Sequence, residues 1–349
     1  MLASGERGLA SGEPVEVACD ESGYEGEHHI GATTDVFAHA SVRLRIEEAA
    51  ACVQELRDRI RSPAMTYKSG HLLREKHRSA LVWLLGPSGP MLGKAQVHLT
   101  DKTFFVVGRV VDLLAGDLTG EPGARDGQAM AVTLYREGRR VFGSRRWEAF
   151  LRSSNDLLRA RNRRGPGTSV DSFFGMIDGL RIASTPGPVG QILESLWRAR
   201  PRADSFRSRL LDDPATIPAL DPLVPAIVAA VVHWGEGSRP VAIVHDQHTS
   251  LTQERLGQLM RLLSEPRRRL ASLTLVDSRA APRVQVADFL AGVARKIASD
   301  ELNHRRDPEL TALLRPYVDA SSTWGDERSW ALLSPPGGRS GAGRRPGRT

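Results

Sequence analysis

Segments with strand character alternate with segments of helical spacing at both ends of the chain, and this alternation restricts the fold more than any other feature. Short, alternating or continuous apolar segments predict strands at residues 15–20, 36–44, 95–99, 241–245 and 270–276. Apolar residues at three- and four-residue steps predict helices at residues 46–60, 72–85, 103–114, 251–263 and 284–298. Strands separated by helices are typical of an α/β domain, in which helices flank a central sheet.

The middle of the chain, from about residue 121 to residue 238, shows helical spacing interrupted by Gly and Pro. We interpret it as a large helical insertion before the fourth strand. Its basic residues are grouped at residues 139–140, 145–146 and 159–164. The whole α/β domain is expected to span residues 15–330, with disordered segments at residues 1–14 and 331–349.

The formal net charge of +7 favours a nucleic-acid partner, because basic side chains neutralise phosphates. Charge alone leaves the question open, since four of the arginines belong to the Gly-, Pro- and Ser-rich tail, namely Arg339, Arg344, Arg345 and Arg348. Two cysteines, Cys19 and Cys52, are too few for a disulfide framework. We find no signal peptide and no run of roughly 20 apolar residues, so we expect a cytoplasmic protein without membrane contact.

Three aspartates occupy special positions in this scheme. Asp20 ends the first strand, Asp246 ends the fourth, and Asp288 lies inside the last long helix. Neighbouring strands that end at the same edge of a sheet bring their last side chains together, and a helix packed there adds the third carboxylate. Clustered carboxylates raise one another's pKa unless a cation neutralises them, and ligands that are all oxygen suit Mg²⁺ or Mn²⁺. The sequence therefore predicts a divalent-metal site in which the aspartates are ligands.

The last long helix carries a continuous stripe that includes Asp288. Gln285, Gly292 and Arg295 fall on the same side of this helix as Asp288. The neighbouring side chains are small, namely Ala287, Ala291 and Gly292. We expect these small residues to let the helix approach the sheet closely, so that the carboxylate reaches the strand ends.

Two motifs together resemble the domain of unknown function 3800 family. They are Asp-Glu-Ser-Gly at residues 20–23, after a strand, and Gln-Val-Ala-Asp-Phe-Leu-Ala-Gly at residues 285–292, in a late helix. Asp246 at the end of a middle strand and Ser278 before the helix also match the features of this family. The family is regarded as ribonuclease H-like, which implies a mixed central sheet and a metal-dependent nuclease with Asp20, Asp246 and Asp288 as catalytic metal ligands. The resemblance spans most of residues 15–300.

One departure concerns a fourth carboxylate. Relatives commonly place an acidic residue before a Lys after the first long helix, where this chain has Thr66-Tyr67-Lys68. Glu21 is our candidate for the fourth metal ligand, although it would point to the opposite face of the strand from Asp20. Two further glutamates remain open as substitutes, Glu47 and Glu48.

Several polar residues are candidates for binding a substrate. We assign this role to Ser22, Lys68, Lys102, His248 and Arg283. His248, close to Asp246 in sequence, is also a candidate proton shuttle, whereas His245 alternates away from Asp246 and is expected to pack internally. For the lysines and the arginine, the alternative is an ordinary solvated charge. Asp101 and Asp277 also follow strands and are second choices for the metal site.

The function that these features favour is Mg²⁺- or Mn²⁺-dependent hydrolysis of phosphodiesters in nucleic acid. Two alternatives remain open at this point: a non-catalytic module of the same fold that binds nucleic acid or protein, and a phosphatase or nucleotide hydrolase that uses the same metals. The glycine-rich segment at residues 86–94 is not a phosphate-binding loop, because its spacing is wrong and no Ser or Thr follows Lys94.

Overall fold

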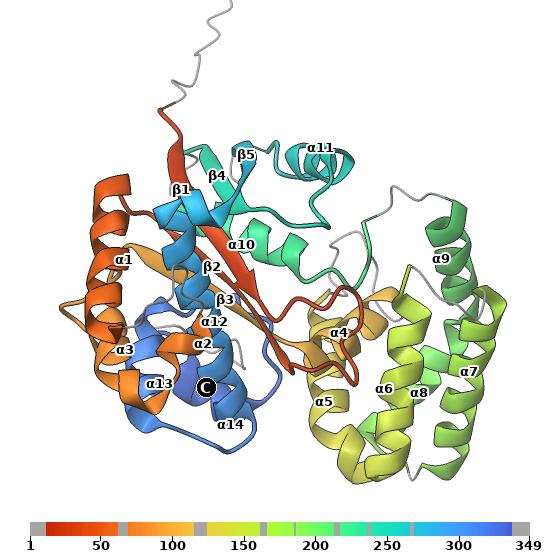
Figure 1. The fold of residues 1–349 in the computed structure, drawn as a ribbon. Coiled ribbons are helices and arrows are strands. Elements are labelled where there is room, and N and C mark those ends of the chain that lie inside the picture. The colour runs from red at the N-terminus through yellow and green to blue at the C-terminus, as the bar shows by residue number, and fades with distance from the viewer. Residues whose placement is uncertain are drawn as a thin grey trace, which may run out of the picture.

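The computed structural model describes residues 12–61, 69–114, 124–160, 166–184, 186–212, 217–235, 239–265 and 269–336. The protein is an α/β structure in which helices flank both faces of a mixed five-stranded sheet, and a separate group of helices lies beside the sheet (Figure 1). Among the described residues, no helix is both long enough and apolar enough to cross a membrane.

The sheet has the strand order β3-β2-β1-β4-β5. Its strands are β1 (Val15–Ser22), β2 (Val36–Val42), β3 (Ala95–Asp101), β4 (Val241–Asp246) and β5 (Leu270–Val276). β1 and β3 are antiparallel to β2, whereas β4 is parallel to both β1 and β5. All five predicted strands are therefore present, and the carboxyl end of central β1 lies beside that of β4.

Long and short helices cover one face of the sheet. They are α1 (Ile46–Ile60), α2 (Ser69–Leu72), the 3-10 helix η1 (Glu75–His77), α3 (Arg78–Leu85), α12 (Pro282–Leu302), α13 (Pro308–Leu314), η4 (Arg315–Tyr317) and α14 (Glu327–Leu333). α12 lies directly against β1 and β2, and its apolar residues are buried on nearly all sides. The strands present small side chains to it, including Ala18, Ala38 and Ala40, all fully buried. The small residues on both sides let α12 approach the sheet closely, as the sequence predicts.

The other face of the sheet is covered by α10 (Leu223–Trp234) and α11 (Gln253–Leu262). Alternate strand residues such as Val17, Cys19 and Ile243 form an apolar core there. Three buried histidines, His39, His98 and His245, share this face with the apolar residues, and the rings of His39 and His245 stack with centroids 5.3 Å apart. This side of the sheet thus combines an apolar core with a layer of imidazoles.

The helical group packs around a core of its own. Its members are α4 (Lys102–Leu114), α5 (Ala124–Phe142), α6 (Ser144–Leu158), α7 (Pro166–Ala183), α8 (Pro188–Arg198) and α9 (Arg200–Asp212). The described residues between β3 and β4 form helices and no strand, in agreement with the helical pattern of the sequence. α4, which the sequence places before the insertion, packs with this group, whereas α10 leaves it and covers the sheet.

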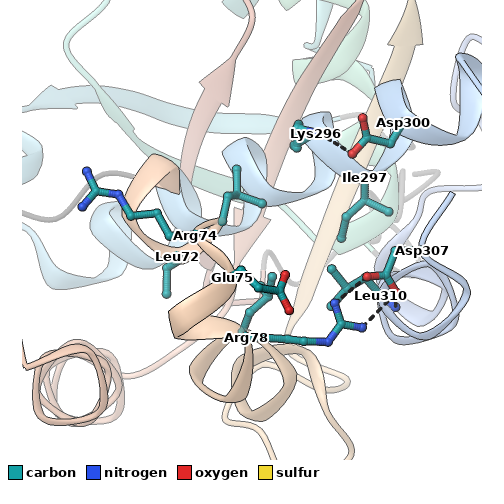
Figure 2. Close-up of a pocket in the computed structure, with 11 residues that line it drawn as sticks. Leu72, Arg74, Glu75, Arg78, Lys296, Ile297, Asp300, Asp307 and Leu310 are labelled. Carbon is teal, nitrogen blue, oxygen red and sulfur yellow. Dashed lines mark hydrogen bonds and ion pairs between the residues drawn. The ribbon is translucent and has the colours of Figure 1, made fainter. Parts of the chain in front are cut away.

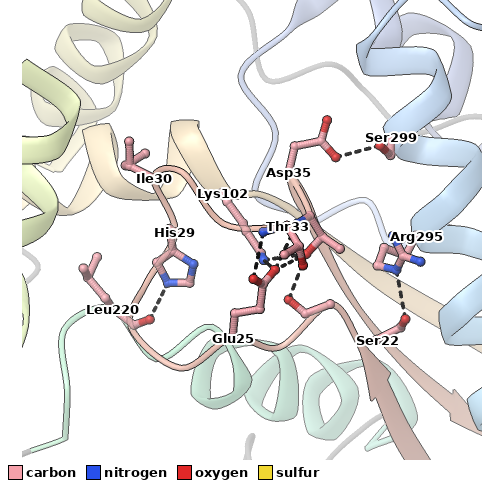
Figure 3. Close-up of polar contacts among 12 residues, drawn as sticks. Ser22, Glu25, His29, Ile30, Thr33, Asp35, Lys102, Leu220, Arg295 and Ser299 are labelled. Atoms are coloured by element: carbon pink, nitrogen blue, oxygen red, sulfur yellow. Dashed lines mark hydrogen bonds and ion pairs between the residues drawn. The ribbon is translucent and has the colours of Figure 1, made fainter. Parts of the chain in front are cut away.

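The connection between β1 and β2, residues 23–35, joins the sheet to the helical group. Asn155 on α6 accepts hydrogen bonds from the backbone N–H of His29 (3.0 Å) and Ile30 (3.2 Å), and it donates to the carbonyl of Glu27 (3.0 Å). The ring of His29 also bonds the carbonyl of Leu220 at 2.6 Å (Figure 3). Hydrogen bonds therefore fasten this connection both to α6 and to the segment just before α10.

Two boundaries differ from the sequence prediction. The segment 72–85, predicted as one helix, is divided into α2, η1 and α3. At the carboxyl end, α14 continues to Leu333, whose side chain is fully buried, so ordered structure extends past residue 330. Residues 1–11 and 337–349, the rest of the segments predicted to be disordered, lie outside the described residues.

Candidate functional site

Asp20 and Asp246 end two neighbouring parallel strands. Cys19 on β1 lies opposite His245 on β4, so the two aspartates are the next residues of adjacent strands. Ala18, two residues before Asp20, packs in the core under α12, and so does Val244, two residues before Asp246. Both carboxylates therefore belong to the face of the sheet that α12 covers.

Asp288 on α12 is close enough to the end of β1 for its negative charge to raise the pKa of Asp20. The pKa of Asp20 is raised to about 9, first by burial and then by the negative charges of Glu21, Asp288 and Asp246. The backbone N–H of Glu21 donates to Asp20 Oδ1 at 2.7 Å and opposes this rise. Asp20 is only 6% exposed, so little water screens this repulsion. The sheet edge and α12 thus bring the charges of Asp246 and Asp288 close enough to Asp20 to raise its pKa.

The Asp246 carboxylate is held by backbone donors. Its Oδ1 accepts from the N–H of Gln247 (2.9 Å) and of Ser278 (3.0 Å). The side chain of Gln285 donates to the carbonyls of Ser278 (2.9 Å) and Arg279 (3.0 Å), which fixes the short 3-10 helix η3 (Ser278–Ala280) against α12. Ser278 and Gln285, which the sequence motifs contain, therefore orient Asp246 through the backbone.

Glu21 lies on the opposite face of β1, as the alternation along the strand predicts. Its carboxylate faces the rings of His248 (Nε2 at 3.4 Å) and His245 (Nε2 at 3.7 Å). The pKa of Glu21 is raised to about 7, first by burial and then by repulsion from Asp246 and Asp288. A side-chain hydrogen bond with Asp20 opposes this rise, so the Glu21 carboxylate contacts both Asp20 and the two imidazoles.

His248 is a partly buried neighbour of Glu21. Its Nδ1 lies 2.7 Å from Ser250 Oγ, and its ring meets Tyr24 edge-on with centroids 4.4 Å apart. Burial lowers the pKa of His248, which favours the neutral ring. His245 is fully buried and packs internally, as the sequence predicts, with Nδ1 2.9 Å from the carbonyl of Asp246.

The chemistry of these carboxylates fits a hard divalent cation. Among the described residues, no group of three or more His, Cys, Asp or Glu side chains has the arrangement of an assembled metal site. Asp20, Asp246 and Asp288 nevertheless offer only oxygen atoms, as Mg²⁺ and Mn²⁺ prefer. The repulsion that raises the pKa of Asp20 is the cost that a bound cation would remove.

The structure places the predicted substrate-binding residues in different surroundings. Ser22 lies at the end of β1, where its Oγ accepts a hydrogen bond from Arg295 Nε at 3.0 Å. Lys102 is 1% exposed, and its ammonium group pairs with Glu25 at 2.9 Å. Arg283 pairs with Glu16 at 2.5 Å, near the start of β1 and far from Asp20.

Other carboxylates that the sequence singled out have local structural partners. Asp101 accepts from two backbone N–H groups of the first turn of α4, and Asp277 accepts from the N–H of Arg279 at the start of η3. Glu48 pairs with Lys94 at 3.0 Å, and Glu47 is in the first turn of α1. The positions of Thr66 and Lys68 lie outside the described residues.

Two residues near the site were not among the predicted substrate-binding residues. Glu25 neutralises Lys102, and Arg295 extends the Asp288 stripe of α12 to Ser22. The helical periodicity already placed Arg295 on that stripe, which was the signal available in the sequence.

Comparisons of this chain with protein-family models, with curated proteins and with solved structures found no match. The resemblance to the domain of unknown function 3800 family therefore stays a prediction that rests on the motifs at residues 20–23 and 285–292.

Proposed function

We propose that this protein is a ribonuclease H-like, divalent-metal-dependent nuclease that cleaves phosphodiester bonds in nucleic acid. The observation that carries the proposal is that Asp20 and Asp246 end two neighbouring parallel strands and that the charges of Asp246 and of Asp288, on α12, both act on Asp20. A mixed sheet with helices on both faces supports the fold assignment, and the helical group between β3 and β4 supports the proposed insertion.

Each carboxylate has a distinct part in the proposed site. Asp20 is buried and rigidly placed by the centre of the sheet, so it is suited to hold a cation away from bulk water. Asp246 keeps one oxygen on two backbone donors, which orients the other oxygen. Asp288 approaches from α12 and completes the set. When bound, Mg²⁺ or Mn²⁺ would supply a Lewis acid for the phosphoryl oxygen and an activated water.

Cleavage assays with matched variants test this function. The full chain would be incubated with labelled single-stranded DNA, duplex DNA, RNA and RNA–DNA hybrid in the presence of Mn²⁺ or Mg²⁺. Asp246→Asn and Asp288→Asn are expected to lower the cleavage rate roughly 100-fold or more, because each removes a metal ligand. Asp300→Asn is the matched control on α12, since Asp300 forms surface ion pairs with Lys296 and Arg305.

Equal cleavage by the wild type and by Asp288→Asn would refute the proposal. Binding of nucleic acid without metal-dependent cleavage would instead identify a non-catalytic binding module, and cleavage restricted to phosphate monoesters or nucleotides would identify a phosphatase or a nucleotide hydrolase.

A further inference from the structure

Arg295 presents a fixed cation beside the carboxylate edge. Its Nε donates to Ser22 Oγ at 3.0 Å, which fixes the plane of the guanidinium group (Figure 3). The two terminal nitrogens make no hydrogen bond to any other described residue and are not buried. The side that carries the paired donors of the guanidinium fork is therefore available to a ligand.

No carboxylate among the described residues forms an ion pair with Arg295. The neighbouring cation Lys102, in contrast, is neutralised by Glu25, and Arg283 on the same helix is neutralised by Glu16. Arg295 also contributes a repulsive charge to Lys102, so two cations approach each other here and only one has a protein counter-charge. A partly buried guanidinium without a counter-charge is a favourable site for an anion.

Gly23 maintains the position of the Arg295 side chain. A Cβ at residue 23 would lie 2.7 Å from Arg295 Cδ and 2.5 Å from the carbonyl oxygen of Val36, and Gly23 has φ +84°. Only glycine allows both this backbone conformation and the close passage of the arginine stem. Gly23 thus leaves room for the arginine stem, and Ser22 accepts the hydrogen bond from the guanidinium group.

The location of Arg295 relates it to the aspartates. Ser22 is two residues beyond Asp20 on the same face of β1, about 7 Å along the strand. Arg295 is seven residues beyond Asp288, about 10 Å along α12. The guanidinium fork therefore lies on the same face of the sheet as the carboxylates, beyond Asp20 along β1 and beyond Asp288 along α12.

From this geometry we infer that Arg295, oriented by Ser22, clamps a phosphate of the nucleic-acid backbone next to the phosphate that is cleaved. The inference rests on the proposed function for the identity of its ligand. A bidentate contact between guanidinium and phosphate oxygens positions the strand without reading its sequence. Arg295 is thus a positioning residue.

The test measures binding and cleavage separately. Binding of fluorescein-labelled DNA and RNA oligonucleotides would be followed by fluorescence anisotropy over a range of salt concentrations, with a chelator present so that no cleavage occurs. Arg295→Gln is expected to weaken binding about tenfold to hundredfold and to reduce the slope of log affinity against log salt by about 0.7–0.9. Lys296→Gln, the matched control on α12, removes an exposed cation that pairs with Asp300 and is expected to change neither.

Two further measurements separate a phosphate contact from a structural role. Arg295→Lys keeps the charge and the aliphatic stem but lacks the fork, so it should bind more weakly than wild type with an unchanged salt slope. Oligonucleotides in which one phosphate at a time is a neutral methylphosphonate should abolish the difference between wild type and Arg295→Gln at one position only. In cleavage assays with Mn²⁺, Arg295→Gln should raise KM more than it lowers kcat.

The clamp is refuted if wild type fails to bind at low salt, or if Arg295→Gln binds like Lys296→Gln. Cleavage that persists while binding is independent of Arg295 would reject the clamp and leave the nuclease proposal standing. Binding that depends on Arg295 without any cleavage would reject the nuclease proposal and the placement of the clamp beside a cleaved phosphate, while the contact between Arg295 and a phosphate would stand.

Discussion

His98 should make the folded protein sensitive to acid. It lies on β3, 4% exposed, on the face that α10 covers. Neither ring nitrogen has a hydrogen-bond partner among the described residues. Its titratable neighbours are His39, the register partner on β2, and Asp319 in the segment that pairs with β3. The pKa of His98 is lowered from 6.5 to about 4, because the effect of burial outweighs the opposing effect of the Asp319 charge.

The sign and size of the effect follow from this shift. Because the folded pKa lies below the unfolded value, the unfolded state binds the proton more readily between about pH 4 and pH 6.5. The free energy of unfolding is therefore highest above that range and falls as the pH falls through it. At 1.36 kcal/mol per pKa unit, the His98 contribution at about pH 5 is a loss of about 2 kcal/mol.

Urea unfolding of wild type and His98→Gln, followed by circular dichroism at pH 7.5 and pH 5, measures this loss. The variant should lose about 2 kcal/mol less stability than wild type between the two values, because Gln does not titrate. His28→Gln, which replaces an exposed histidine, should lose as much as wild type. If His98→Gln and wild type lose the same amount, His98 is protonated in the folded state and the reasoning fails.

Two other stability predictions concern buried polar contacts. Asn155→Ala should cost about 3 kcal/mol, because it leaves two backbone N–H groups and a carbonyl of the β1–β2 connection without partners; a urea titration with unchanged stability would contradict this. Lys102→Met should cost about 3 kcal/mol or more, because the Glu25 carboxylate loses its counter-charge, and the double variant Lys102→Met/Glu25→Gln should recover most of that loss in the same assay. A double variant no more stable than the single one would show that the ion pair is not the cause.

Periodicity predicted the fold well where each element's own residues determine it. The alternation of β1 up to Asp20 and the spacing of α1 are local signals, and α1 has the bounds that the sequence predicts, Ile46–Ile60. The break between α2 and α3 has no such signal. There, Ser69 of α2 packs directly against Gly292 of α12, since a Cβ added at Gly292 would lie only 1.9 Å from the Ser69 Oγ. Contact with a helix distant in sequence therefore fixes the orientation of α2.

The same distinction applies to the site. The positions of Asp20 and Asp246 at strand ends are readable from the sequence, because a strand's last residue is a local property. The surroundings of Lys102 and Arg283 are not, because their partners Glu25 and Glu16 lie far away along the chain. Arg295 was visible on the helical stripe, but its bond to Ser22 requires α12 to lie against β1.

The β1–β2 connection links the helical group to the end of β1 where the carboxylates lie. Its first residues follow Ser22 directly, and its middle is fastened to α6 by the hydrogen bonds of Asn155. A pocket of about 170 Å³ lies between α3, α12 and α13 and is lined by the Arg78–Asp307 ion pair (Figure 2). α12 therefore has the pocket at one end and Asp288 toward the other. A displacement of α6 would therefore be passed along residues 23–35 to Ser22 and, through its hydrogen bond, to Arg295, in addition to the direct link in which β3 continues into α4.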